Sequence, residues 1–176
     1  MDGVLADWDA KHKELFGCSG DVMRNSKMTK AERREYNDKL VNQYRMFENL
    51  EPMPLVEVLK QFPGMFKILS ATGNKFPAEV AEQKRAWLKK QFGEALPDEN
   101  IILVQRSVNK AVYAHKHSAL IDDRMKAIEP YVEAGGMAMQ FINHPGQIDD
   151  IKTILTQLVE NDSIVMESLY NQPIEN

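Results

Sequence analysis

Short apolar runs alternate with stretches of helical spacing along this chain of 176 residues. Short apolar runs that end in polar loops are typical of strands buried inside a sheet. Strands that alternate with helices predict a parallel sheet covered on both faces, which is a doubly wound α/β fold. The expected strands are residues 65–69, 101–104, 119–121 and 137–142, together with Val4 and Leu5 as the end of an earlier strand.

Local signals predict where several helices begin and end. The run Thr29-Lys30-Ala31-Glu32 is a capping-box pattern, so a helix should begin near Lys30, and its helical spacing continues to Phe47. Pro77 suits the first turn of a helix that runs to about Phe92 and stops at Gly93. Residues 18–28 are rich in turn formers. The other expected helices cover residues 7–16, 54–62 and 124–134, with a final amphipathic helix that carries Ile148, Ile151, Leu155 and Leu158.

The helical stretch within residues 18–53 interrupts the alternation of strands and helices. It comes after the first expected strand, so it is predicted to be an insertion into the α/β domain. Periodicity is weak after residue 160. We therefore expect a core domain of residues 1–17 and 54–160, a small helical cap of residues 18–53, and a C-terminal tail of residues 161–176.

Composition excludes some classes of partner. A net charge of −4 argues against a dedicated nucleic-acid binder, because such proteins usually carry a basic excess. No apolar run is long enough to span a membrane, and no signal peptide is visible. The single cysteine, Cys18, cannot form an internal disulfide, so a reducing cytoplasm is the expected location. The oligomeric state stays open, a homodimer included.

Polar side chains follow the predicted strands at the edge where open parallel sheets bind ligands. Clustered carboxylates need a cation between them, and Mg²⁺ prefers oxygen ligands. Hydroxyl and ammonium groups can hold phosphate oxygens, so this set predicts phosphoryl transfer with Mg²⁺ as the cofactor. The residues concerned are Asp2, Asp7, Ser70, Thr72, Lys110, Asp122 and Asp123.

Four motifs in order resemble those of the haloacid dehalogenase-like phosphohydrolases. They are Asp2-Gly3-Val4, Ser70 after Ile68-Leu69, Lys110, and Leu120-Ile121-Asp122-Asp123-Arg124. The resemblance implies hydrolysis through an aspartyl-phosphate. The roles it implies are general acid/base and Mg²⁺ contact for Asp2, phosphate binding for Ser70, Thr72 and Lys110, catalytic stabilisation of the phosphoryl group for Lys110, and Mg²⁺ binding for Asp122 and Asp123. Lys116 and Lys84 are alternatives to Lys110, with Lys84 expected at a surface or at the sheet edge.

A narrower match is similar to the 5′(3′)-deoxyribonucleotidases. It consists of residues 2–8, the run Phe47-Glu48-Asn49-Leu50-Glu51-Pro52-Met53-Pro54, and residues 120–124. It implies an enzyme of nucleotide metabolism that hydrolyses a deoxyribonucleoside 5′-monophosphate. Trp8 and Phe47 match the aromatic residues that stack on the nucleobase. Plain packing explains Trp8 equally well, and it is the favoured explanation for Phe47. Arg106 is a further candidate for substrate binding, or for pairing with nearby acids.

The chain departs from that family at its first residue. The nucleophilic aspartate of the family precedes the position of Met1, and this sequence has no residue there. One explanation is a misplaced start, with roughly five to ten further residues upstream, enough for one strand. The other is a shortened protein that binds a nucleotide or a partner without catalysis. We favour the first, because the other site residues are all kept. A phosphatase for sugar phosphates or for nucleic-acid ends is a third interpretation.

Overall fold

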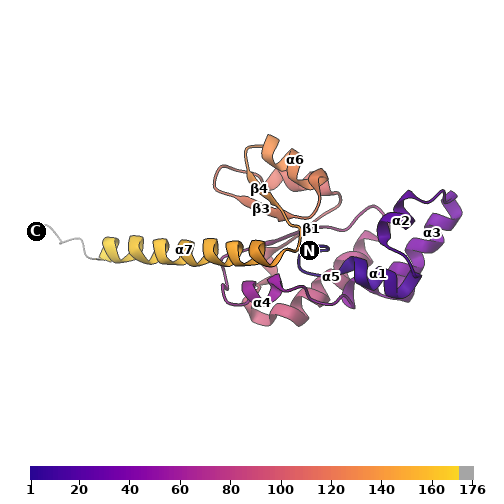
Figure 1. Cartoon of the computed structure of the whole chain (residues 1–176), viewed down its shortest axis with the longest axis horizontal. Coiled ribbons are helices and arrows are strands. Elements are labelled where there is room, and N and C mark those ends of the chain that lie inside the picture. Colours follow the sequence, from indigo (N-terminus) through magenta and orange to yellow (C-terminus); the bar gives the residue numbers. More distant parts are fainter. Residues whose placement is uncertain (171–176) are drawn as a thin grey trace, which may run out of the picture. The chain divides into compact units, whose positions relative to one another are not determined.

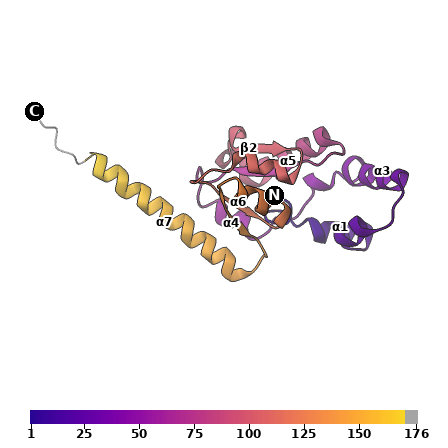
Figure 2. The same cartoon turned by 90° about the horizontal axis from the view of Figure 1, so that it is seen from above.

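The computed structural model describes the backbone of residues 1–170 and the side chains of residues 1–160 apart from Arg24. The chain divides into two compact units, Met1–Ile142 and Asn143–Asn176. The first unit is a mixed α/β fold with short parallel strands (Figures 1 and 2). In the second unit the structure describes helix α7 (Pro145–Tyr170).

The first unit begins with helices and continues with alternating strands and helices. Its helical first part contains α1 (Trp8–Phe16), α2 (Gly20–Asn25), α3 (Lys30–Asp38), the π-helical turn η1 (Lys39–Gln43), the 3₁₀ turn η2 (Met46–Glu48) and α4 (Leu55–Leu59). Its second part contains β1 (Ile68–Ala71), α5 (Pro77–Phe92), the 3₁₀ turns η3 (Gly93–Ala95) and η4 (Asp98–Asn100), β2 (Ile101–Val104), the 3₁₀ segment η5 (Ser107–Tyr113), β3 (Ala119–Asp122), α6 (Met125–Glu133) and β4 (Met137–Gln140).

The helix ends that have strong local signals are confirmed. The backbone N–H of Glu32 donates to the Thr29 hydroxyl at 3.2 Å, and the backbone N–H of Thr29 donates to the Glu32 carboxylate at 2.7 Å. These two bonds form the predicted capping box. Helix α5 begins at Pro77 and is followed by Gly93 with a φ of +55°. Both ends depend on bonds between close neighbours in the chain.

Three helical predictions need correction. The helix from Lys30 does not reach Phe47, because α3 gives way to η1 and the chain then turns at Arg45, whose φ is +44°. A short helix, α2, occupies part of the turn-rich residues 18–28. The backbone of residues 161–170, expected as part of the tail, continues α7, and residues 171–176 of that predicted tail lie outside the described residues.

The predicted strand end at Val4 and Leu5 is wrong. The carbonyl of Met1 accepts hydrogen bonds from the backbone N–H groups of Val4 at 3.1 Å and Leu5 at 2.8 Å. Gly3 has a φ of +75°, a conformation that glycine adopts readily and that ends an extended segment. The chain therefore turns back directly after Asp2 instead of extending through Leu5.

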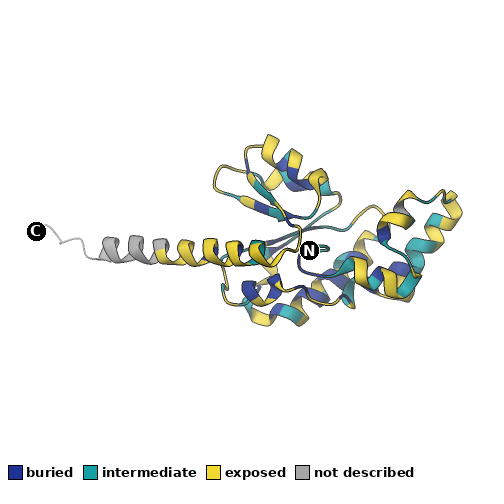
Figure 3. Cartoon of the chain, viewed as in Figure 1, coloured by how far each residue is buried: buried dark blue, intermediate teal, exposed yellow. Residues whose placement is uncertain are grey.

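The later strands form two separate parallel pairs in place of one sheet. β1 pairs with β2 from Ile68↔Ile101 to Ala71↔Val104. β3 pairs with β4 from Ala119↔Met137 to Asp122↔Gln140. Helix α4 is buried at most of its positions, as Figure 3 shows in dark blue. The fully buried ring of Trp87 on α5 donates from Nε1 to the carbonyl of Leu50 at 2.7 Å, which ties α5 to the segment after η2.

Residues 18–53 fold mainly as α2, α3, η1 and η2, and they belong to the same compact unit as the strands. His12 of α1 is fully buried where α1 meets this helical segment. One of its ring nitrogens lies 2.7 Å from the carbonyl of Cys18, and the other lies 2.7 Å from the hydroxyl of Tyr36. The His12 ring also stacks on the ring of Trp8 and on the ring of Phe16, each at a centroid distance of 4.8 Å. The contact between His12 and Tyr36 joins α1 to α3.

Candidate active site

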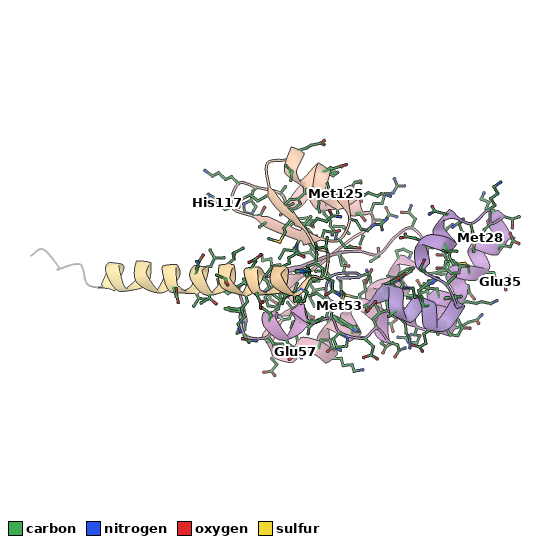
Figure 4. All side chains as sticks on the ribbon, viewed as in Figure 1. Met28, Glu35, Met53, Glu57, His117 and Met125 are labelled. Carbon is green, nitrogen blue, oxygen red and sulfur yellow. The ribbon has the colours of Figure 1, made fainter. Side chains whose placement is uncertain are left out.

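A cavity of about 700 Å³ lies at the carboxyl ends of β1, β2 and β3. Nine of the residues that the sequence nominated line this cavity: Asp2, Trp8, Phe47, Ser70, Thr72, Arg106, Lys110, Asp122 and Asp123. Asp7 does not line it; its carboxylate caps α1 instead, accepting from the backbone N–H of Ala10 at 2.9 Å. A smaller cavity of about 310 Å³, near Lys11 and Lys90, is lined by none of them. In Figure 4, His117 lies just before β3 and Met125 lies just after it, at the start of α6. The cavity is at the Met125 end of β3.

Lys110 and Asp122 form a buried ion pair on one side of the cavity. The Lys110 Nζ donates to Oδ2 of Asp122 at 2.5 Å, and each side chain is only 6% exposed. The other carboxylate oxygen accepts from the backbone N–H of Arg124 at 3.0 Å. Asp122 ends β3 while Lys110 comes from η5, so the sheet edge and the 3₁₀ segment together hold this pair.

Asp123 lies beside this pair and against the turn at Gly3. Burial, and then the charge of Asp122, raises the pKa of the Asp123 carboxyl above its usual value. A Cβ atom on Gly3 would lie 2.5 Å from Oδ2 of Asp123, closer than real atoms approach. Glycine at position 3 therefore permits both the turn after Asp2 and the close approach of Asp123 to it.

Lys84 is the main residue of this site that sequence reasoning misplaced. The sequence suggested a surface or sheet-edge lysine, but the Lys84 side chain is 1% exposed. Its Nζ donates to Oδ2 of Asp2 at 2.6 Å, to the hydroxyl of Ser70 at 2.9 Å and to the carbonyl of Ala71 at 2.8 Å. All three N–H donors of the Lys84 ammonium thus have partners. Asp2, the acid/base candidate, and Ser70, a phosphate-binding candidate, therefore share one buried cation.

A sequence signal for Lys84 exists in the pattern of α5. The buried residues of this helix include Val80, Lys84, Trp87 and Leu88, which share one helix face. A lysine on an otherwise buried face has to find anionic or carbonyl partners, because burying an unpaired charge is costly. The partner could not be read from the sequence, since Asp2 is 82 residues away.

The two hydroxyl candidates differ in their surroundings. Ser70 is 2% exposed and accepts from Lys84. Thr72 is half-buried, and its hydroxyl makes only long contacts of 3.4 Å to the carbonyl of Val104 and 3.5 Å to that of Gly73. Thr72 can therefore redirect its hydroxyl at lower cost than Ser70.

Two aromatic side chains form part of the cavity wall. The Trp8 ring stacks on His12, and a Cβ atom on Gly20 would lie 1.7 Å from it, so packing holds the ring in place. The ring of Phe47 lies 5.2 Å from the Lys84 Nζ, within the range of a cation–π interaction. Both rings thus have structural contacts and also line the cavity.

Positive side chains line the side of the cavity near η5 and α6. They are Arg106, Arg124 and Lys126, all exposed. None of the three makes an ion pair within the part of the chain that the structure describes, and Arg106 has a long contact of 3.4 Å to Asn74. These cations are available to an anionic ligand, whereas Lys84 and Lys110 are already paired.

The oxygen ligands suit a hard cation such as Mg²⁺. Oδ1 of Asp2 is buried and has no hydrogen-bond partner among the described atoms. Within residues 1–160, no three side chains of His, Cys, Asp or Glu gather closely enough to form a complete metal site. Mg²⁺ usually keeps several waters and is held by one or two carboxylates with substrate phosphates. Asp122 and Asp123 therefore fit an ion that is completed by water and substrate.

No protein-family model matches this chain, and no curated protein matches it either. The resemblance to phosphohydrolases therefore depends on the motifs and on where their residues lie. Within the described residues, no helix is both long enough and apolar enough to cross a membrane.

Proposed function

We propose that this cavity is the active site of a Mg²⁺-dependent phosphomonoesterase, a hydrolase of the haloacid dehalogenase-like type. The observation that carries the proposal is that nine nominated residues line one cavity, although they extend from Asp2 to Asp123 in the sequence. Carboxylates, hydroxyls and ammonium groups at one place can bind a phosphate and move a proton.

In the proposed reaction, residues of this chain act together with a carboxylate at the position before Met1, which is not among the residues of this sequence. Lys110 and Ser70 bind the phosphate oxygens, with Thr72 as a further hydroxyl. A carboxylate at the position before Met1 attacks the phosphorus, and Asp2 donates a proton to the oxygen of the departing alcohol. Asp2 then takes a proton from water, which attacks the aspartyl-phosphate and releases phosphate. Mg²⁺, held by Asp122, Asp123 and the backbone carbonyl of Asp2, would neutralise the phosphate charge beside the carboxylates.

The proposed substrate is a nucleoside 5′-monophosphate, and a deoxyribonucleotide is the first choice. Trp8 and Phe47 line the cavity, and the proposal has the base stack on one of these rings. Stacking of this kind contributes about 1–3 kcal/mol per base. Arg106 would contact the substrate from the opposite loop. A cytoplasmic location and a small soluble substrate, with neither a membrane nor a nucleic acid as partner, belong to the same proposal.

The test uses the protein isolated from its own cells, with its intact mass measured alongside. We expect release of phosphate from thymidine 5′-monophosphate that requires Mg²⁺ and is abolished in the double variant Asp122→Asn with Asp123→Asn. Release without Mg²⁺, or release by the double variant, would show that this mechanism is wrong. A panel with sugar phosphates and 5′-phosphorylated oligonucleotides separates the substrate classes.

The alternative is a protein that binds nucleotides without hydrolysis. The observation that favours it is that Asp2 and Asp122 are each neutralised by a lysine. A mass of 20.1 kDa, together with nucleotide binding and no release of phosphate, would support this alternative over the enzyme.

A further inference from the structure

Three exposed cations line one side of the candidate active site. Arg106 immediately precedes η5, while Arg124 and Lys126 flank the first residue of α6, Met125, which Figure 4 labels. The first turns of η5 and α6 contain no acidic residue. A cavity wall that carries charges of one sign attracts ions of the opposite sign. This side of the cavity therefore favours an anionic group.

The acidic residues nearest to these cations in the chain are already engaged. Asp122 forms the buried ion pair with Lys110. Asp123 lies against the turn at Gly3, and burial, followed by the charge of Asp122, raises the pKa of its carboxyl. Neither carboxylate makes an ion pair with the three exposed cations within the described side chains. The cations are thus left to a ligand.

The cations lie nearer to solvent than the groups proposed to bind the reacting phosphate. Ser70 and Lys110 are buried, whereas Arg124 is exposed. The backbone N–H of Arg124 donates to Oδ1 of Asp122 at 3.0 Å, and the other oxygen of this carboxylate accepts from Lys110. The backbone that carries Arg124 is therefore fixed beside the inner site. The cavity thus has an inner and an outer position for an anion.

Aromatic side chains occupy a third part of the cavity wall. Trp8 belongs to α1 and Phe47 to η2, whereas the exposed cations come from η5 and α6. The sugar of a nucleotide carries its base, its 3′ oxygen and its 5′ oxygen on three different carbons. A second phosphate on the 3′ oxygen gives such a ligand two anionic groups and one aromatic group. The cavity of about 700 Å³ has a size suited to a small molecule of this kind.

We propose that the cavity binds a nucleoside 3′,5′-bisphosphate and that its exposed cations form a second anion site. Ser70 and Lys110 bind the 5′ phosphate, which reacts. Arg106, Arg124 and Lys126 bind the 3′ phosphate, which does not react. The inference rests on the proposed function for the inner site and adds the outer one. Hydrolysis adds water across the bond between phosphorus and the 5′ oxygen, which yields a nucleoside 3′-monophosphate and inorganic phosphate.

The test measures binding by isothermal titration calorimetry, in buffer freed of divalent cations and at fixed ionic strength. The ligands are thymidine 5′-monophosphate, thymidine 3′,5′-bisphosphate and thymidine 5′-diphosphate. We expect the bisphosphate to bind about tenfold or more tightly than the monophosphate, because its 3′ phosphate gains charge-assisted hydrogen bonds. The 5′-diphosphate has an added phosphate but none at the 3′ position, so its affinity should stay within about threefold of the monophosphate's.

Two double variants with the same change of charge assign the effect. Arg124→Gln with Lys126→Gln removes two cations of the outer site. Lys30→Gln with Lys89→Gln removes two exposed lysines that do not line the cavity. We expect the first variant to prefer the bisphosphate by less than about threefold and to keep its affinity for the monophosphate within about threefold. The control variant should keep the preference of the unchanged protein.

Equal affinities of the unchanged protein for the monophosphate and the bisphosphate would overturn the proposal. So would an equal loss of preference in the control variant, or an equal gain for the 5′-diphosphate. Release of phosphate with Mg²⁺ is measured separately. If the preference depends on Arg124 and Lys126 but neither nucleotide is hydrolysed, the second anion site stands and the proposed function fails. If the monophosphate is hydrolysed and no preference exists, the proposed function stands and this inference fails.

Discussion

Two lysines organise the cavity at the residue scale. Lys84 neutralises Asp2 and Lys110 neutralises Asp122, and both ammonium groups are nearly inaccessible to solvent. The buried part of the site thus contains paired charges, whereas the cations without an ion pair, Arg106, Arg124 and Lys126, lie at the exposed edge of the cavity. A phosphate would enter a site in which the Asp2 and Asp122 carboxylates are already balanced and Asp123 is not, so its own charge calls for a further cation.

Replacing Lys84 by methionine tests the first pair. The change Lys84→Met leaves the Asp2 carboxylate and the Ser70 hydroxyl without their shared donor. Because Asp2 keeps 29% of its side-chain exposure, we expect a loss of about 2–3 kcal/mol in the free energy of unfolding. Urea unfolding measures it. The control is Lys89→Met at an exposed position of the same helix, which should change stability by less than about 0.5 kcal/mol. Equal losses in the two variants would contradict the assigned contact.

Replacing Gly3 by alanine tests the approach of Asp123. Gly3→Ala combines a positive φ with a clash against the Asp123 carboxylate. Gly64→Ala is a matched control, since Gly64 has a φ of +82° and nothing within 4 Å of the added Cβ atom. We expect Gly3→Ala to be the more destabilising of the two by about 1 kcal/mol or more. Similar unfolding free energies for both variants would show that Asp123 does not lie against the turn.

At the element scale, helices α1 and α3 meet through a buried histidine. His12 lies between aromatic rings and makes polar contacts with both of its ring nitrogens. Trp8 belongs to the same stack, so this packing also orients one wall of the cavity. The position of the helical segment relative to the cavity therefore depends on a small number of side chains.

The change Tyr36→Phe tests that junction. It removes the hydroxyl 2.7 Å from the His12 ring and leaves a buried ring nitrogen unsatisfied. We expect a loss of about 1–2 kcal/mol in stability, measured by urea unfolding. Tyr44→Phe is the control, because Tyr44 also packs against Phe16 while its ring is 42% exposed. If both variants unfold at the same urea concentration, the contact between His12 and Tyr36 contributes nothing to stability.

At the scale of the whole molecule, a chain produced with its free amino group at Met1 has a buried charge site that links stability to pH. Burial, and then the nearby charges of Lys110 and Lys84, lowers the pKa of the Met1 amino group to about 5. In the unfolded chain the group keeps its usual value of 8.0. Between these two values the unfolded state binds more protons than the folded state, so stability falls as the pH is lowered from 8 toward 5.

N-terminal acetylation isolates this effect. We expect the free energy of unfolding of the free chain to fall by at most about 1.4 kcal/mol per pH unit between pH 8 and 5, relative to the acetylated chain. Acetylation removes the titrating amino group and, among the other groups, acts mainly on Asp123, whose pKa the charge of that amino group helps to lower. Parallel stability curves for the two forms over this range would show that the Met1 amino group is not buried.

Local patterns in the sequence determined the helix ends at Thr29, Pro77 and Gly93 and the approximate places of the later strands. Those features depend on bonds and conformations within a few residues, which a sequence displays directly. The motif residues could also be assigned to one edge, because parallel strands end on the same side. Only the tertiary structure decided that Lys84 contacts Asp2, that Gly3 turns the chain away from a strand, and that the strands form two pairs. The first and the last of these depend on packing between segments that are distant in the sequence, where local propensity carries no information. The turn at Gly3 is closed by local bonds to the Met1 carbonyl, but its fit against Asp123 is likewise a contact between distant residues.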